Sequence, residues 1–216
     1  MKIAINKKGK STDESTVCLN RVSKYIDCNE FSTIRENLLS SASTVCEIHN
    51  IKDVILKSST EKNKDRTNLL NEKYILRWAH GTEDEVELIK ECSKGRLVKS
   101  ITEKISVETA LRIVDRSTKW LCTSISPLLR EVGVKMTTER LRPEAVMSFD
   151  RESFNIENRL KITADSGIVL CDYDEALNVE NFKSTEPVDK NVCLLQVNYD
   201  RIIPDHISSL IGIKAN

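Results

Sequence analysis

The sequence changes character at Gly133, and this change constrains the fold more than any other feature. Before Gly133, apolar residues recur at the three- and four-residue spacing of amphipathic helices. After it, short apolar runs are separated by Asp, Ser, Gly, Asn and Pro, which is typical of strands and turns. The pattern therefore predicts an α+β fold, with an N-terminal and central helical array followed by a mostly antiparallel C-terminal sheet.

The expected helices come from apolar spacing and from capping residues. Ser126-Pro127 is a good N-cap and first-turn pair, and Gly133 is expected to end that helix. Thr82 and Glu85 have the spacing of a capping box. Helices are expected over 32–49, 69–79, 82–95, 97–105, 106–121 and 126–133, and strands over 1–6, 51–56, 160–163, 168–170 and 192–197. Residues 204–213 fit a closing helix or an edge strand.

The longest stretch without an apolar residue, 57–68, predicts an exposed polar loop and the best internal boundary. It separates an N-terminal strand and helix segment, 1–56, from the helical array, 69–133. A sheet-rich region, 134–216, follows. The same pattern fits one continuous domain, since 216 residues make one large domain or two small ones.

Charge and composition indicate an ordinary intracellular globular protein. The 33 Lys and Arg residues balance 33 Asp and Glu residues, so the basic excess usual in proteins that hold duplex nucleic acid is absent. No apolar run approaches the roughly 20 residues that cross a bilayer, and the start of the chain turns polar too soon for a signal peptide. Seven cysteines at irregular spacing argue against a disulfide framework and favour buried thiols.

The run 167–175 predicts an apolar strand that ends in three carboxylates, Asp172, Asp174 and Glu175. Paired carboxylates at a strand end can bind Mg²⁺ or supply a nucleophile and an acid for phosphoryl transfer. Asp172 and Asp174 are therefore the candidate catalytic residues. An acidic turn closing a hairpin between strands near 168 and 192 explains the same run without chemistry, and this interpretation is favoured.

The segment Ile-Val-Leu-Cys-Asp-Tyr-Asp, residues 168–174, resembles the first motif of haloacid-dehalogenase-type phosphatases. In that family the first aspartate attacks the phosphate and the second acts as acid and base. Glu175-Ala176 stands where the family has Gly-Thr or a similar pair, and too little chain follows for the family's α/β domain. The resemblance covers about nine residues and does not assign the chain to the family.

Cys46 and His49 are three residues apart on an expected helix, a spacing that can place two metal ligands on one face. A zinc site needs two more ligands, and the sequence has no second Cys/His pair. No metal site is therefore expected from these residues, and no cofactor is expected except Mg²⁺ at the carboxylates.

The densest basic cluster lies where the helical and sheet regions meet, and it consists of Arg130, Lys135, Arg140 and Arg142. Arg151 and Arg159 extend it. A phosphate backbone or an acidic protein surface could dock there. Glutamates are interleaved with these residues, so pairing within the chain is an equal alternative.

The leading hypothesis is a non-enzymatic intracellular protein that binds a macromolecule through the basic cluster, with nucleic acid slightly preferred over protein. The alternative is a metal-dependent phosphoryl-transfer enzyme that uses Asp172 and Asp174. A third hypothesis is a structural subunit of a larger assembly. No membrane contact is expected, and the sequence leaves the oligomeric state open.

Overall fold

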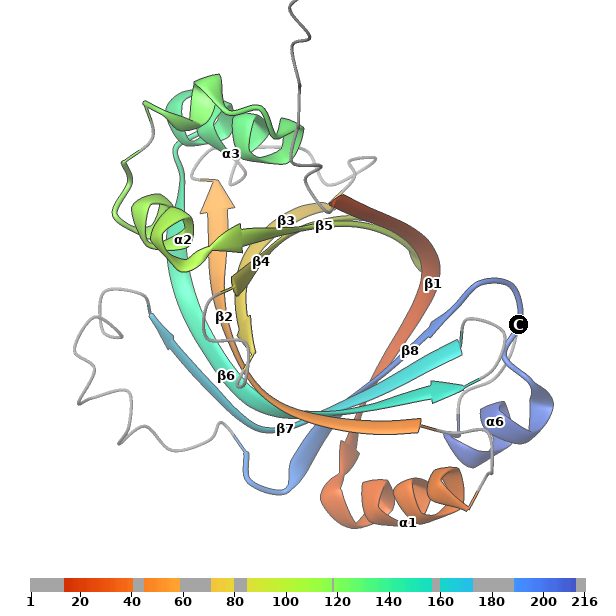
Figure 1. Ribbon diagram of the computed structural model, residues 1–216. Helices are drawn as coiled ribbons and strands as arrows, with labels where there is room; N and C mark the ends of the chain where they lie inside the picture. The colour runs from red at the N-terminus through yellow and green to blue at the C-terminus, as the bar shows by residue number, and fades with distance from the viewer. Residues whose placement is uncertain are drawn as a thin grey trace, which may run out of the picture.

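Eight antiparallel strands close into a barrel within the residues that the computed structural model describes, which are 14–40, 45–58, 71–79, 85–117, 119–156, 160–172 and 189–212 (Figure 1). The strands are β1 (Glu14–Asp27), β2 (Val45–Ser58), β3 (Asn71–Ala79), β4 (Glu85–Lys94), β5 (Leu97–Ser106), β6 (Leu141–Ile156), β7 (Leu160–Asp172) and β8 (Val192–Tyr199). Their order around the barrel is β1-β5-β4-β3-β2-β6-β7-β8, and β8 pairs with β1 to close it. Closure leaves this sheet without an exposed edge.

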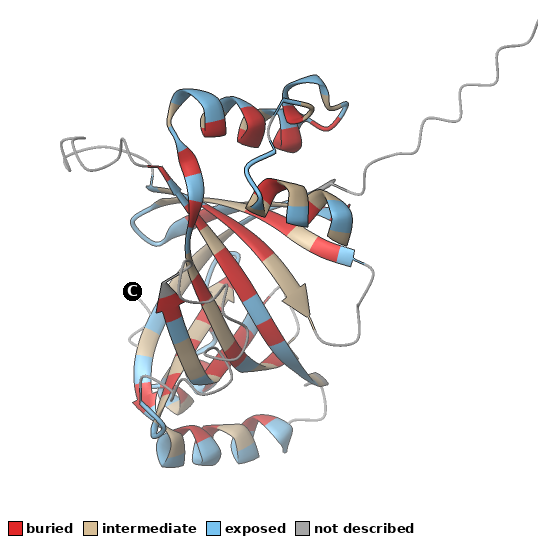
Figure 2. Ribbon diagram, turned by 90° about the vertical axis from the view of Figure 1, so that its left-hand side faces the viewer, coloured by how far each residue is buried: buried red, intermediate tan, exposed pale blue. Residues whose placement is uncertain are grey.

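Short helices cover the two ends of the barrel wall from outside. Two α-helices, α2 (Val107–Val114) and α3 (Pro127–Thr138), lie at one end together with a 3₁₀ helix, η2 (Leu121–Thr123). The other two, α1 (Cys28–Leu39) and α6 (Asp205–Leu210), lie at the opposite end (Figures 1 and 2). No helix within the described ranges has the length and apolar character needed to cross a membrane.

The apolar cores lie outside the barrel, between the wall and these helices. One core joins α2, η2 and α3 to the outer faces of β2 to β6, and it includes Leu76, Leu88, Ile113 and Val132, all fully buried. The second joins α1 and α6 to β1 and to β6, β7 and β8, with Phe154 and Leu195 at its centre. Because the outer faces are apolar, the inner face can be polar.

The expected α+β fold with a helical array is wrong. Three of the expected helices, 69–79, 82–95 and 97–105, contain strands β3, β4 and β5. On β4, Val86 and Leu88 are fully buried under the outer helices, while Glu87 and Glu91 alternate with them. The period is therefore two: Val86 and Leu88 point outward, whereas Glu87 and Glu91 point inward. Ile89 is an apolar residue on the inner side, and its spacing from Val86 and Cys92 gives the sequence a helical pattern.

Some local expectations are confirmed. Ser126 is the N-cap of α3 and accepts the backbone N–H of Leu129, with Pro127 in the first turn. That helix continues through Gly133 to Thr138. The helix expected to begin at Ser32 begins earlier, at Cys28 with Asp27 as N-cap, and its second half is strand β2. The expected strand 1–6 lies outside the described residues. Residues 59–68 of the expected polar loop also lie outside them.

Candidate functional site

The inner face of the barrel carries the two most deeply buried ion pairs among the described residues, Arg77 with Asp53 and Arg151 with Asp165. Cross-strand partners point to the same side of a sheet, and the register places Arg77 of β3 opposite both Asp53 of β2 and Glu87 of β4. Glu87 is in turn opposite Lys104 of β5. The residues that alternate with this row pack into the outer core, so the row itself faces the lumen.

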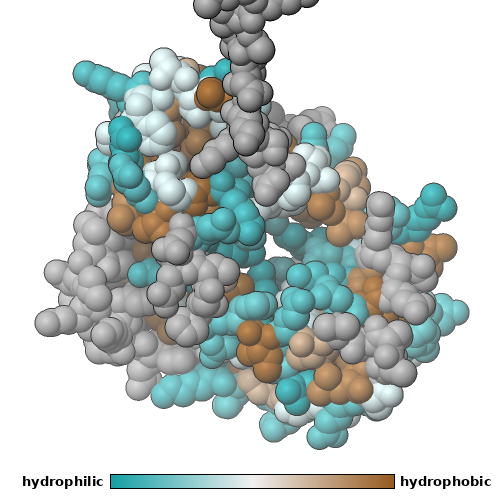
Figure 3. All heavy atoms as spheres, viewed as in Figure 1, coloured by the Kyte–Doolittle hydropathy of each residue, from teal (hydrophilic) through white to brown (hydrophobic). Residues whose placement is uncertain are grey.

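Part of the lumen is a polar hollow of about 410 Å³. Figure 3 shows hydrophilic side chains gathered around the opening in the middle of the barrel. The hollow is lined by Glu47, His49, Ile51, Arg77, Ala79, Glu85, Glu87, Lys104, Arg151, Ser153 and Lys161. Four cations from four different strands therefore share one space with three carboxylates.

Arg77 is held from behind by a buried carboxylate. Its Nε donates to Oδ1 of Asp53 at 2.8 Å, and its Nη2 donates to Oδ2 at 2.7 Å. The Asp53 side chain is 1% exposed and that of Arg77 is 18% exposed. Burial lowers the pKa of Arg77, but the hydrogen bonds and the charge of Asp53 outweigh it and raise the pKa. Arg77 therefore stays charged in the wall of the hollow.

Arg151 repeats this arrangement on the next strand pair. Its Nε and Nη2 donate to Oδ1 and Oδ2 of Asp165 at 2.6 and 2.7 Å, and the two residues are direct partners of β6 and β7. Its guanidinium also lies 4.9 Å from the centre of the Phe149 ring. A bidentate pair and an aromatic face together fix the plane of a guanidinium.

Arg21 of β1 uses its guanidinium differently. Its Nη1 and Nη2 donate to Glu91 of β4 at 3.1 and 2.8 Å, and its Nε donates to Asn198 of β8 at 2.8 Å. Burial raises the pKa of Glu91, but the hydrogen bond and charge of Arg21 outweigh it and lower the pKa below its usual range. Arg21 thus joins three strands.

Lys161 of β7 is the lumen cation without a hydrogen-bond or ion-pair partner among the residues described. Burial lowers its pKa, Glu47 acts against this, and Arg151 and Arg77 lower the pKa further. The Lys161 side chain is exposed, and it lines the hollow inside the barrel. An anion in the hollow would relieve this destabilisation of the ammonium.

Cys46 and His49 cannot form the two-ligand face that helical spacing suggested. Both lie on β2, where residues three apart point to opposite sides. His49 lines the hollow, whereas Cys46 packs against the outer core. Within the described ranges, no group of three or more His, Cys, Asp or Glu side chains could hold a metal ion.

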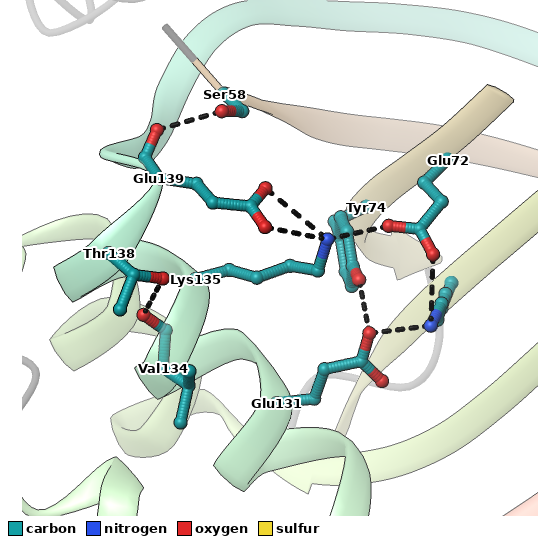
Figure 4. Close-up of polar contacts among 9 residues, drawn as sticks. Ser58, Glu72, Tyr74, Glu131, Val134, Lys135, Thr138 and Glu139 are labelled. Carbon is teal, nitrogen blue, oxygen red and sulfur yellow. Dashed lines mark hydrogen bonds and ion pairs between the residues drawn. The ribbon is translucent and has the colours of Figure 1, made fainter. Parts of the chain in front are cut away.

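The basic cluster expected from sequence lies outside the lumen, on and after α3. Arg130, Arg140 and Arg142 are exposed. Lys135 is engaged: it donates to Glu72 at 2.6 Å and to Glu139 at 3.3 Å, over the ring of Tyr74 (Figure 4). Lys135 therefore fastens α3 to β3.

Glu131 of α3 extends this network. It accepts a hydrogen bond from the Tyr74 hydroxyl at 2.6 Å (Figure 4). It accepts another from Lys90 at 2.5 Å. Burial first, and then Glu131, raises the pKa of Tyr74 far above its usual value. Of the glutamates interleaved with the basic cluster, Glu139 pairs with Lys135, whereas Glu131 pairs with Lys90 and Glu144 with Lys57, both outside the cluster. Whether the three exposed arginines bind a partner stays a prediction.

Of the carboxylates singled out from sequence, only the backbone of Asp172 belongs to the part of the chain that the structure describes. Asp172 ends β7 opposite Ala145, and its side chain, together with Asp174 and Glu175, lies outside the described residues. Asp53, Arg77, Asp165 and Lys161 were not predicted as site residues from the sequence, and Arg151 was predicted only as an extension of the basic cluster. A signal existed: Lys161-Ile-Thr-Ala-Asp165 alternates polar and apolar residues, as a strand with one polar face does.

Comparison with known proteins identifies the family. A family model described as the VTC domain matches residues 20–215, nearly the whole chain. The chain belongs to the VTC domain family. No curated protein matches the sequence.

Two solved structures share the barrel of this VTC domain. One is a candidate adenylate cyclase from Bacillus halodurans, with a TM-score of 0.59, 8% identity, and 93% of each chain covered. The other is a candidate adenylyl cyclase from Hippeastrum with a dominant triphosphatase activity, with a TM-score of 0.54 and 9% identity. That comparison covers 92% of this chain and 89% of the other.

The family and the barrel overturn the leading hypothesis of a non-enzymatic protein that binds nucleic acid or another macromolecule through a helical array. The array does not exist, because its central segments are barrel strands. Of the hypotheses drawn from the sequence, the alternative of a phosphoryl-transfer enzyme agrees best with these findings.

Proposed function

We propose that this VTC domain binds a compound with a triphosphate chain in the barrel lumen and acts on it by phosphoryl transfer. The observation that carries the proposal is the convergence of Arg77, Lys104, Arg151 and Lys161, from four strands, on one polar hollow. Guanidinium and ammonium groups are the usual protein ligands of phosphate oxygens. The triphosphatase activity of the Hippeastrum protein, which has a similar barrel, supports this choice of substrate.

The hollow can supply electrostatic stabilisation and positioning, which make up most of the protein's contribution to phosphoryl transfer. Arg77 and Arg151 are fixed in the wall by buried carboxylates, so they need not reorganise when charge moves between phosphate oxygens. Lys161 is available for a direct contact, since its ammonium has no ion-pair partner among the described residues.

A divalent cation, which such chemistry commonly uses, would neutralise part of the phosphate charge. The side chains described do not fit a metal site made by the protein alone, because they contain no group of three potential ligands. Mg²⁺ usually takes only one or two carboxylates together with substrate phosphates. The described side chains are therefore expected to bind the cation only together with the phosphate chain, so Mg²⁺ or Mn²⁺ has to be added with the ligand.

The test is binding of tripolyphosphate and of ATP by titration calorimetry, with and without Mg²⁺ or Mn²⁺, together with an assay of phosphate release. Lys161→Ala is expected to weaken binding about 10-fold, since a charge-assisted hydrogen bond contributes on the order of 1.5–3 kcal/mol. Lys24→Ala is the matched control, because Lys24 pairs with Glu30 of α1 and does not line the hollow. Failure of the parent protein to bind any triphosphate compound under all these conditions would overturn the proposal.

A further inference from the structure

We infer that Asp53 and Asp165 are positioning residues that aim Arg77 and Arg151 at two different phosphoryl groups of one phosphate chain. This inference rests on the proposed function, because it takes the lumen as the phosphate site. It adds a basis for ligand selectivity: simultaneous contact with two arginines favours linked phosphates over a single phosphate. Neither aspartate lines the hollow itself.

The first support is the edge of the guanidinium that each aspartate occupies. In both pairs the carboxylate takes Nε and Nη2 and leaves Nη1 without a partner among the described residues. A guanidinium has five N–H donors in a fixed plane. Holding the Nε edge therefore directs the remaining donors, on the opposite edge, to a second acceptor.

The second support is burial. The side chains of Asp53 and Asp165 are 1% and 4% exposed, whereas both arginines reach the surface of the hollow. Each carboxylate thus lies behind its arginine as seen from the lumen, where a ligand cannot displace it easily. The strand register makes each pair direct cross-strand partners, so the backbone fixes the position of both members.

Arg21 provides an internal contrast. All three of its guanidinium nitrogens have partners, two on Glu91 and one on Asn198. Arg21 also does not line the hollow. Arg21 therefore only joins strands, whereas Arg77 and Arg151 keep N–H donors that a ligand can use.

The third support is the distance along β2 between the two arginine–aspartate pairs. Arg77 lies opposite Asp53, and Arg151 lies opposite His49, on the two sides of that strand. Four residues of strand separate these positions, which is about 13 Å along β2. The two guanidinium groups therefore enter the hollow from separate places on the wall, and a chain of linked phosphates can contact both at once.

The test compares orthophosphate, pyrophosphate and tripolyphosphate as ligands in titration calorimetry. In the parent protein the affinity is expected to rise at least about 10-fold from orthophosphate to tripolyphosphate, since each added charge-assisted contact strengthens binding. Asp53→Asn and Asp165→Asn are each expected to lose most of this gain while orthophosphate binding changes little. Glu91→Gln, which removes the ion pair of Arg21, is the control and should keep the rise in affinity from orthophosphate to tripolyphosphate.

A double-mutant cycle separates positioning from a direct effect on the ligand. Arg77→Ala combined with Asp53→Asn should bind tripolyphosphate no more weakly than Arg77→Ala alone, because Asp53 acts only through Arg77. If Asp53→Asn does not fold, Arg77→Lys gives the answer. A lysine ammonium keeps the charge but has no second edge, so the chain-length gain should again fall.

The outcomes distinguish the two proposals. Absence of binding to any phosphate compound by the parent protein defeats the proposed function and this inference together. If the parent protein binds tripolyphosphate but the aspartate variants or Arg77→Lys keep the full gain, or bind more tightly, the inference alone is wrong.

Discussion

The Ser126 hydroxyl donates a hydrogen bond to the carboxylate of Glu103, and both side chains are almost fully buried. The same hydroxyl accepts the backbone N–H of Leu129 at 3.1 Å. One oxygen atom therefore caps α3 and joins that helix to β5 of the barrel wall. The outer helix and the wall are fastened at this point by a polar contact within an apolar core.

Ser126→Ala removes both roles of this hydroxyl. We expect the free energy of unfolding to fall by about 2–3 kcal/mol, because an N-cap contributes about 1 kcal/mol and a lost partner of a buried acceptor adds about 1–2 kcal/mol. Urea denaturation measures the change. Ser106→Ala is the matched control: Ser106 caps α2 in the same way but is exposed, so a loss of about 1 kcal/mol is expected. Equal losses at the two caps would contradict this account.

Gly133→Ala tests the packing of α3 on η2. Glycine is a poor helix former, so the substitution would stabilise an isolated helix by about 1 kcal/mol. In the folded protein the added Cβ would lie 2.6 Å from Cβ of Leu121 and 3.1 Å from the backbone nitrogen of Cys122. We therefore expect a net loss of at least about 1 kcal/mol, measured by thermal and urea unfolding. Stabilisation by this substitution would show that the helices can move apart.

Glu91→Gln should weaken the acid dependence of stability. Because the folded-state pKa of Glu91 lies below its unfolded value, this residue contributes stability that is fully present above the unfolded pKa of about 4.3. That contribution is lost as the pH falls through the folded-state pKa. We expect the variant to lose stability at pH 7 and to differ little from the parent near pH 2, in urea titrations across this range. A uniform offset at every pH would contradict the prediction.

The thiol pair at the start of α1 should show slow chemistry at its buried member. Sγ of Cys28 and Sγ of Cys193 are 3.1 Å apart, and Cys193 is 1% exposed. Burial, and then the hydrogen bond with Cys28, raises the pKa of Cys193 to about 12. We expect alkylation of Cys193 in the native protein to be far slower near pH 8 than that of exposed Cys18, and to accelerate as the pH rises. Peptide mass spectrometry measures both rates, and equal rates would contradict the prediction.

Elements whose signals are local could be predicted from the sequence. Ser126-Pro127 carries its own capping chemistry, and the strand signals at 160–163 and 192–197 come from alternation and β-branched residues within a few positions. Strands β3 to β5 were wrongly predicted as helices because they have apolar residues on the outer face and charged residues such as Arg77 and Glu87 on the inner face. Polar residues are normally expected on the side away from the core, and here that side is the lumen.

The candidate site could not be read from the sequence for a related reason. Asp53 and Arg77 are 24 positions apart, and Arg151 and Asp165 are 14 apart. No local motif links the members of either pair, since only the antiparallel register makes them neighbours. The acidic run at 172–175, which has a visible motif, was selected because its members are adjacent in the chain.

The sequence by itself determined local elements whose free energy depends on neighbouring residues, such as the Ser126 cap of α3 and the strands around 160–163 and 192–197. Only the tertiary structure decided that the strands close into a barrel and which of their faces points inward. Closure requires β8 to pair with β1, a contact between the two ends of the described chain. That pairing places the charged faces of the strands around a shared hollow. The pattern within a single strand cannot specify this arrangement, because each charged side chain has its partner on another strand.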